Sequence, residues 1–162
     1  MTAFGDAGIS LDLPRAWDGQ IRAAGRGYTS SRAATVAPTD AGPEVGVVLH
    51  AATFALPAER GDYGSGAVEV MGGSDILICL LEHEPEAAAT ALFRRTRVPS
   101  LRADAFSPQS MQRAIAGMSG CQRFFQVAGR PFCLYVVVGS HATRAPLVRT
   151  ADSVVRTISI SA

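Results

Sequence analysis

The stretch Phe132-Cys133-Leu134-Tyr135-Val136-Val137-Val138 is the most hydrophobic run of the sequence. A run of this length without polar alternation predicts a β-strand that other elements cover on both faces. It belongs to residues 130–139, which follow residues 121–127 across the dipeptide Ala128-Gly129. A two-residue connection that contains glycine is typical of an antiparallel hairpin. We therefore expect a hairpin whose second arm lies inside a sheet.

After this hairpin, apolar residues recur at the spacing of an amphipathic helix. The apolar face consists of Leu147, Val148, Ala151, Val154, Val155 and Ile158. The polar face consists of Arg149, Asp152, Ser153 and Arg156. This pattern predicts a helix over residues 145–157, and the following Ile158-Ser159-Ile160 predicts a short closing strand.

Upstream of the hairpin, strand patterns are separated by glycine- and proline-rich connections. Apolar alternation or continuous apolar character predicts strands at residues 9–13, 20–24, 45–56, 75–84 and 101–106. Between them, residues 25–42 are rich in Gly, Ser, Thr and Ala. We expect a long irregular connection there, with a short strand at residues 34–37, and this connection is the best candidate for a mobile loop.

Two further helices are expected between the strands. One begins at Pro85, a residue favoured in the first helical turn, and continues to Phe93. The other begins after Ser107-Pro108 and carries Met111 and Met118 at helical spacing. Because no regular βαβ alternation is present, the sequence predicts a single α+β domain over residues 1–162, with an antiparallel β-sheet packed by helices.

The composition excludes several classes of protein. The 162 residues are 48% hydrophobic and 18% charged, with a net charge of +1, which is typical of a globular domain. The chain contains no Lys, which excludes a Walker-type phosphate loop, a Schiff-base enzyme and a pyridoxal phosphate enzyme. It contains no Asn, which excludes an N-glycosylation acceptor and a Cys-His-Asn catalytic set. We expect no cofactor.

Charge patterning argues against a nucleic-acid partner. A nucleic-acid binder usually carries a basic excess or a basic stripe, and neither is visible. The densest basic group is Arg94, Arg95 and Arg97, at the end of the expected helix. We interpret these arginines as a complement to the helix dipole, with phosphate binding as the alternative.

The sequence predicts a cytoplasmic protein without a membrane partner. Residues 1–12 lack the positive region and the apolar run of a signal peptide, and no segment reaches the roughly 18 apolar residues of a membrane span. The three cysteines, an odd number in unrelated contexts, fit a reducing compartment.

The arrangement of these elements resembles the PsbP/Mog-like superfamily, which includes bacterial lipoproteins and secretion-associated chaperones. The opening Gly8-Ile9-Ser10-Leu11-Asp12-Leu13-Pro14-Arg15-Ala16-Trp17 looks like the family's start of a strand, a proline, a small or basic residue and a tryptophan. The ending, a hydrophobic hairpin strand followed by a helix and a last strand, is also similar. The resemblance implies an αβα sandwich and functions of binding rather than catalysis. The family has no shared catalytic residues, so none is assigned.

The densest titratable group is Glu82-His83-Glu84. On an extended chain Glu82 and Glu84 share one face and His83 lies on the other, so the three cannot ligate one metal unless Pro85 bends the chain. His50, in an apolar strand, could approach from a neighbouring strand. The alternative is a solvated strand end that begins a helix. We predict no metal site, and we keep the three residues as a candidate binding cluster.

Four other residues are candidates for binding. Asp62 and Tyr63 lie in the glycine-rich segment 61–66, which lacks the Gly-x-Gly-x-x-Gly spacing of a dinucleotide site. Arg123 could complete a small-molecule site with the acidic cluster or with Asp62. Trp17, the only tryptophan, either covers one end of the core or anchors a protein partner.

The cysteines provide neither a disulfide nor a nucleophile in this interpretation. With a two-residue turn at 128–129, Cys133 is expected opposite Phe124 and Cys121 opposite Val136, so a disulfide between the two arms lacks its geometry. A register shifted by one residue would change this expectation. Cys79 lies in an apolar run and is expected in the core.

Three functional hypotheses follow. The first is a non-enzymatic binding or adaptor domain, as a monomer or a homodimer, that holds a protein partner on a sheet face or on the long loop. The second is a small-molecule-binding protein or an enzyme that uses the acidic and histidine cluster. The third is a component or chaperone of a secretion or phage-like assembly. No residue is assigned a catalytic role.

Overall fold

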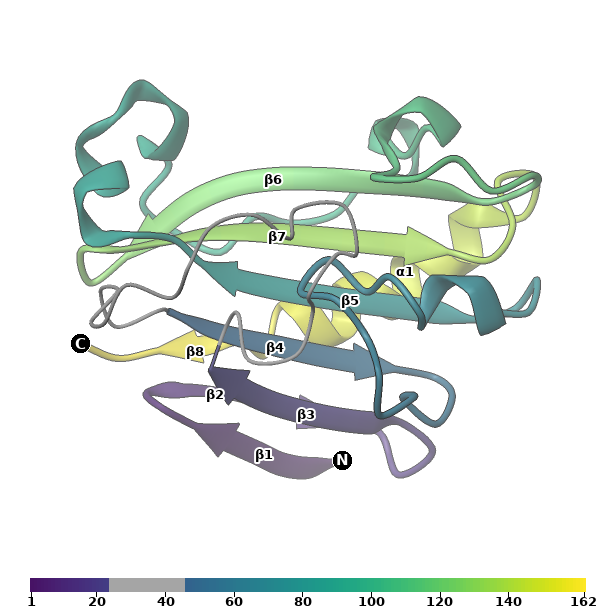
Figure 1. Cartoon of the computed structure of the whole chain (residues 1–162), viewed down its shortest axis with the longest axis horizontal. Coiled ribbons are helices and arrows are strands. Elements are labelled where there is room, and N and C mark those ends of the chain that lie inside the picture. Colours follow the sequence, from purple (N-terminus) through teal and green to yellow (C-terminus); the bar gives the residue numbers. More distant parts are fainter. Residues whose placement is uncertain (24–45) are drawn as a thin grey trace, which may run out of the picture.

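The computed structural model describes residues 1–23 and 46–162, and it is of the α+β class with two antiparallel sheets (Figure 1). The larger sheet has five strands in the order β3-β4-β5-β7-β6, and the smaller has the order β1-β2-β8. The strands are β1 (Thr2–Asp6), β2 (Ile9–Leu13), β3 (Asp18–Ala23), β4 (Val47–Ala52), β5 (Ile76–Glu82), β6 (Ser119–Val127), β7 (Arg130–Val138) and β8 (Ser159–Ile160). The expected connection over residues 25–42 and the strand at 34–37 lie outside the described residues.

The β6–β7 hairpin has the expected turn and register. Ala128 and Gly129 have φ angles of 54° and 76°, which match the left-handed conformation of a type I′ turn. Phe124 pairs with Cys133 and Cys121 with Val136, as expected. These pairs place Cys121 and Cys133 opposite other side chains, and Cys79 of β5 lies opposite His50 and Tyr135. All three cysteines are free and buried.

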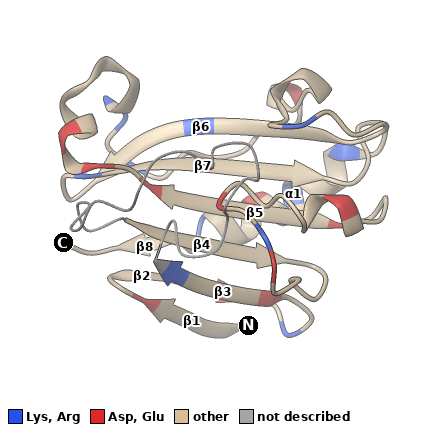
Figure 2. Ribbon diagram, in the orientation of Figure 1, with Lys and Arg blue, Asp and Glu red and all other residues tan. Residues whose placement is uncertain are grey.

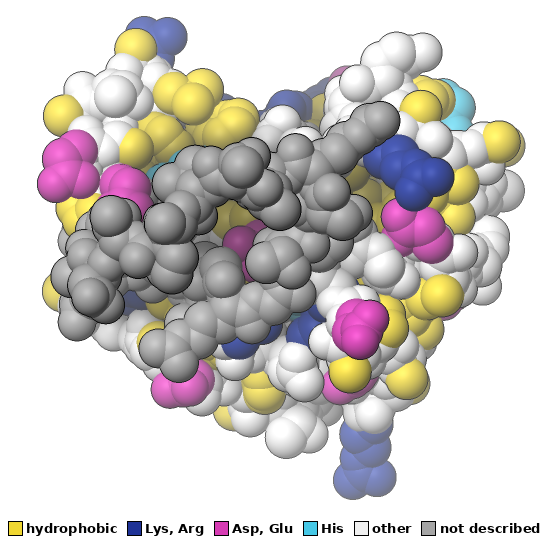
Figure 3. Space-filling view, viewed as in Figure 1, with side chains coloured by type: hydrophobic (Ala, Val, Ile, Leu, Met, Phe, Trp, Pro, Cys, Tyr) yellow, Lys and Arg dark blue, Asp and Glu magenta, His cyan; other side chains and the backbone are white. Residues whose placement is uncertain are grey.

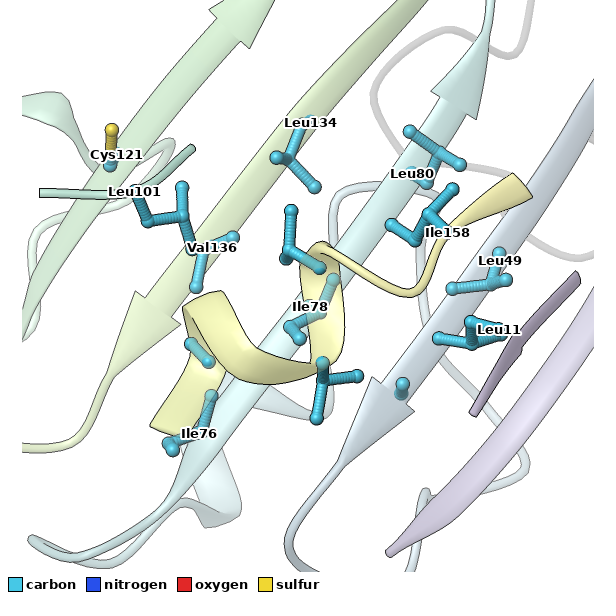
Figure 4. Packing of buried hydrophobic residues seen from close by; sticks show 14 of the residues in the cluster. Leu11, Leu49, Ile76, Ile78, Leu80, Leu101, Cys121, Leu134, Val136 and Ile158 are labelled. Carbon is cyan, nitrogen blue, oxygen red and sulfur yellow. The ribbon is translucent and has the colours of Figure 1, made fainter. Parts of the chain in front are cut away.

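The five-stranded sheet is buried on both faces, and each face has its own apolar cluster. Helix α1 (Arg144–Val155) and the smaller sheet pack on one face, where Leu11 and Ile158 meet residues of the central strands (Figure 4). Met71 and Tyr135 belong to the cluster on the other face, which connections between the strands cover. Strands β5 and β7 are therefore sandwiched, as the uninterrupted apolar run of β7 predicted. Among the described residues, no helix is both long and apolar enough to cross a membrane.

The expected helix from Pro85 to Phe93 is wrong. The segment forms two 3-10 turns, η2 (Pro85–Ala89) and η3 (Ala91–Phe93), separated by Thr90 in an extended conformation. Two of its backbone carbonyls, Ala88 O and Phe93 O, accept hydrogen bonds from the Gln126 side chain instead of from helical amides. Of the residues in these turns only Phe93 is buried, so little apolar burial would reward a continuous helix.

The expected helix after Ser107 is also wrong beyond its first turn. The Ser107 side chain caps the 3-10 helix η5 (Pro108–Ser110) by accepting from the Gln109 N–H, as the sequence indicated. The chain then becomes extended at Met111, and the Gln112 N–H donates to the Tyr135 hydroxyl of the sheet. Likewise, the expected strand at residues 101–106 contains only the 3-10 helix η4 (Ala103–Ala105). The remaining 3-10 helix is η1 (Val68–Val70).

Candidate functional site

The cluster Glu82-His83-Glu84 does not converge on one point. Glu82 accepts two hydrogen bonds from the Arg130 guanidinium, at 2.6 and 3.0 Å, and a third from the Val47 N–H. Burial alone raises the pKa of Glu82, but these hydrogen bonds and the arginine charge lower it overall. The carboxylate therefore joins β5 to β7 and β4, and its oxygens are already occupied.

His83 faces the other side of the sheet, as the alternation along the strand predicted. Its ring packs against Phe93 and Phe124, with centroids 5.2 and 6.2 Å away, and burial lowers its pKa. Glu84 is exposed. In the described part of the chain, no group of three or more His, Cys, Asp or Glu side chains is placed to hold a metal ion.

A second polar network, centred on His50, lies beneath the loop that follows β4. The Arg60 Nε donates to His50 Nδ1 at 2.9 Å, and His50 Nε2 lies 2.8 Å from the Asp62 carbonyl oxygen. Arg60 also donates to the Pro57 carbonyl and to the Gln20 side chain. Burial, together with the nearby cations, lowers the pKa of His50 to about 4. The imidazole is thus neutral at pH 7 and bonds with both nitrogens.

Asp62 and Tyr63, both binding candidates, are tied to this buried face. The Asp62 carboxylate accepts from Arg22 of β3 at 3.0 Å. Tyr63 packs edge-to-face on Tyr135 with ring centroids 5.8 Å apart. Burial, and then the nearby Cys133 thiol, raise the pKa of Tyr63 to about 12. These contacts hold the loop on the sheet.

Arg123 and Trp17 lie apart from those groups. Arg123 is on β6, at one edge of the large sheet, whereas the Arg22–Asp62 ion pair is at the opposite edge on β3. The structure therefore does not bring Arg123 together with Asp62. Trp17 is partly buried against the apolar cluster on the α1 side, which agrees with a core-covering role.

The sequence interpretation missed a surface formed by Arg94, Arg95, Arg97 and Arg156, called here the arginine surface. With no α-helix at residues 85–93, the first three arginines cannot complement a helix dipole. They instead line a hollow of about 710 Å³ whose apolar part includes Leu92 and Phe124. Arg95 and Arg97 also line an adjoining hollow of about 380 Å³ with Arg156 of the α1 end. Neither lining contains an acidic residue.

The charges on the arginine surface are largely available to a ligand. Toward the other described residues, the side chains of Arg94, Arg95 and Arg97 make no hydrogen bond or ion pair. Arg156 uses its Nε for Asp152, at 2.6 Å. The only sequence signal for this surface was the density of arginines, which was assigned to the wrong structural cause.

No family model matches the chain, and neither a curated protein nor a solved structure matches it. Chemically, the titratable residues beneath the Gly-rich loop are held in closed networks, whereas the arginine surface offers open guanidinium groups beside apolar side chains.

Proposed function

We propose that this protein is a non-enzymatic binding or adaptor domain that holds a protein partner on its arginine surface. The observation that carries the proposal is the set of three arginines whose side chains have no partner among the described residues, beside Leu92, which is 56% exposed. Arginine and aromatic residues are enriched at protein interfaces, and the same hollow includes Phe124. Two hollows that share Arg95 and Arg97 offer a contact area larger than a single small ion needs.

The second hypothesis, a small-molecule site or enzyme at the acidic cluster, has weaker support. Glu82 is held by Arg130, His83 lies on the opposite sheet face, and Asp62 is held by Arg22. These groups have no common substrate position. A component or chaperone of a secretion or phage-like assembly is compatible with a protein-binding surface and is a special case of the proposal, as is a homodimer.

The proposal includes the PsbP/Mog-like sandwich and a cytoplasmic location. Support for the sandwich comes from α1, which follows the hairpin and packs on the large sheet before the closing strand β8. Support for the location comes from the three free cysteines, because free thiols persist in reducing compartments.

In-cell crosslinking tests the proposal. A photo-crosslinking residue replaces Leu92, and the adducts are identified by mass spectrometry in native cells. We expect a discrete adduct that disappears in the triple variant R94E/R95E/R97E. A charge-matched control, R15E/R113E/R149E, changes exposed arginines elsewhere and retains the adduct.

The proposal is wrong if no adduct forms and the purified protein is strictly monomeric. It is also wrong if the adduct survives the arginine-surface variant unchanged. An adduct with a second copy of the chain would make the partner the protein itself.

A further inference from the structure

Strand β6 forms one edge of the five-stranded sheet, and among the described strands only β7 pairs with it. In a hairpin with a two-residue turn, the residues beside the turn form a hydrogen-bonded pair, and hydrogen-bonded residues then alternate along each strand. Val127, Phe125, Arg123 and Cys121 thus bond toward β7. The residues between them direct their backbone groups outward.

Described segments occupy the outward groups at both ends of β6. Gly120 exchanges two hydrogen bonds with Ser107, at 3.0 and 3.1 Å. The Gln126 N–H donates to the Arg95 carbonyl at 2.7 Å. Figure 1 shows this arrangement: the loops that carry η3 and η5 flank the two ends of β6.

In the middle of this edge, most outward backbone groups have no hydrogen-bond partner among the described residues. Of the outward groups of Gln122 and Phe124, only the Gln122 carbonyl has a partner there, the Arg123 guanidinium at 3.1 Å. The amide N–H groups of Gln122 and Phe124 and the Phe124 carbonyl are without one. The space-filling view has a notch between two lobes at this position (Figure 3). Unpaired groups on an edge strand are a template for another strand.

The charges beside the notch select the kind of strand that fits. Arg123 lies in the open stretch, and the arginine surface adjoins the Gln126 end through Arg95 (Figure 2). Asp104, whose charge reaches Arg123, is held by Arg102 at 3.0 Å. The exposed Glu84 and Glu86 are not part of the lining of either hollow. The surroundings therefore favour a segment that carries carboxylates.

We propose that an extended acidic segment of the protein partner binds in the notch as an added strand beside β6. Its backbone pairs with Gln122 and Phe124, and its carboxylates contact Arg123 and the arginine surface. This inference rests on the proposed function and adds to it the chemistry of the partner and the mode of recognition. Because residues 120 and 126 are already paired, the added strand is short and the arginine contacts supply much of the selectivity.

The probe is a synthetic peptide of alternating glutamate and valine, titrated at low salt into the ¹⁵N-labelled full chain. We expect the amide signals of Gln122 and Phe124 to shift and their hydrogen exchange to slow. An alternating lysine and valine peptide should not bind. A glutamate and valine peptide with every backbone amide N-methylated should bind at least tenfold more weakly, because it has no backbone N–H group to pair with β6.

A proline substitution separates strand addition from simple charge attraction. In Gln122→Pro the outward N–H is removed, and proline is tolerated on an edge strand when its missing N–H faces outward. We expect binding to weaken at least tenfold, whereas Gln122→Ala, which retains the N–H, should bind within about threefold of the wild type. If Gln122→Pro does not fold, the N-methylated peptide provides the same comparison on the unmodified protein.

The outcomes distinguish the inference from the proposed function. If the peptide binds through the arginines while the Gln122 and Phe124 amides do not respond, strand addition is wrong and the protein-binding function stands. If the peptide does not bind at all, the inference is wrong, and the crosslinking experiment decides the proposed function independently. Equal affinity of Gln122→Pro and Gln122→Ala would also overturn strand addition.

Discussion

At the scale of single residues, the structure depends on the buried guanidinium of Arg60 and on the largely buried ion pair of Glu82 with Arg130. Arg60 is 4% exposed, and its guanidinium is satisfied by His50, Pro57 and Gln20. Because an unpaired buried cation would cost several kcal/mol, the arrangement requires His50 to be a neutral acceptor. The burial that isolates Arg60 thus also keeps the imidazole uncharged.

The His50 network predicts a loss of stability in mild acid. The pKa of His50 is lowered from 6.5 to about 4 by burial and by the nearby arginines, so between these pH values only the unfolded chain binds the proton. The stabilisation is complete above pH 6.5 and is lost as the pH falls toward 4, by at most about 3 kcal/mol. Urea unfolding between pH 7.5 and 4 measures it. His50→Gln should reduce this dependence, and the dependence that remains includes the contribution of His83, whose pKa burial also lowers.

The ion pair of Glu82 with Arg130 leads us to expect a second loss of stability, at lower pH. Their side chains are 14% and 18% exposed, and the pKa of Glu82 is lowered despite burial because Arg130 and the Val47 N–H bind the carboxylate. The stabilisation is present above the unfolded pKa of about 4.3 and is lost as the pH falls through the lower, folded value. Glu82→Gln should cost about 2 kcal/mol at pH 7 in urea unfolding, because Arg130 loses its counter-charge. The adjacent, exposed Glu84 provides the control: Glu84→Gln should change stability little, and an equal effect would contradict the prediction.

At the scale of elements, the β6–β7 turn contains a residue with an unfavourable backbone conformation. Ala128 has a φ of 54°, a region that L-residues with a Cβ adopt at a cost of about 1 kcal/mol. Ala128→Gly should therefore raise the melting temperature by a few degrees, and Gly129→Ala, at a φ of 76°, should lower it. Gly73→Ala is the control, because its φ is not positive and an added Cβ meets no atom within 4 Å. A melting temperature unchanged by both turn substitutions would show that the turn does not limit stability.

The elements that the sequence predicted correctly are those whose cause is local. The Ala128-Gly129 turn determines the hairpin register, and the 3.6-residue periodicity after it determines α1. The two predicted helices do not form because long-range hydrogen bonds take the place of helical ones. The Gln126 side chain donates to carbonyls of the first segment, and the Tyr135 hydroxyl accepts from an amide of the second. Such partners are distant in sequence and leave no local pattern.

The candidate site also has features with local causes, which the sequence predicted, and features with long-range causes, which it did not. The alternation that separates His83 from Glu82 was predictable from strand geometry, and it holds. That Arg130 would neutralise Glu82 depends on the pairing of β5 with β7. The arginine surface was visible as a run of basic residues, but its role depended on a helix that does not form.

At the scale of the whole molecule, the two faces of the central sheet are covered by different kinds of structure. On one face, α1 and the small sheet pack as regular elements against the apolar cluster. On the other, irregular connections place Met111 and Met118 on the sheet without a helix between them. Connections of this kind open locally at lower free energy than strands buried between two layers.

This difference predicts a hierarchy in hydrogen exchange. Amides of β5 and β7, buried from both faces, should exchange only by global unfolding, whereas those of residues 103–118 should exchange at least about 100-fold faster through local opening. Mass-spectrometric exchange of the intact protein measures both. Val136→Ala, a cavity-forming change on the α1 face, should lower the global free energy of unfolding by about 2 kcal/mol. It should therefore accelerate exchange in β5 and β7 while leaving residues 103–118 unchanged. If residues 103–118 exchange as slowly as β7 and accelerate with it, both covers unfold together with the sheet as one cooperative unit.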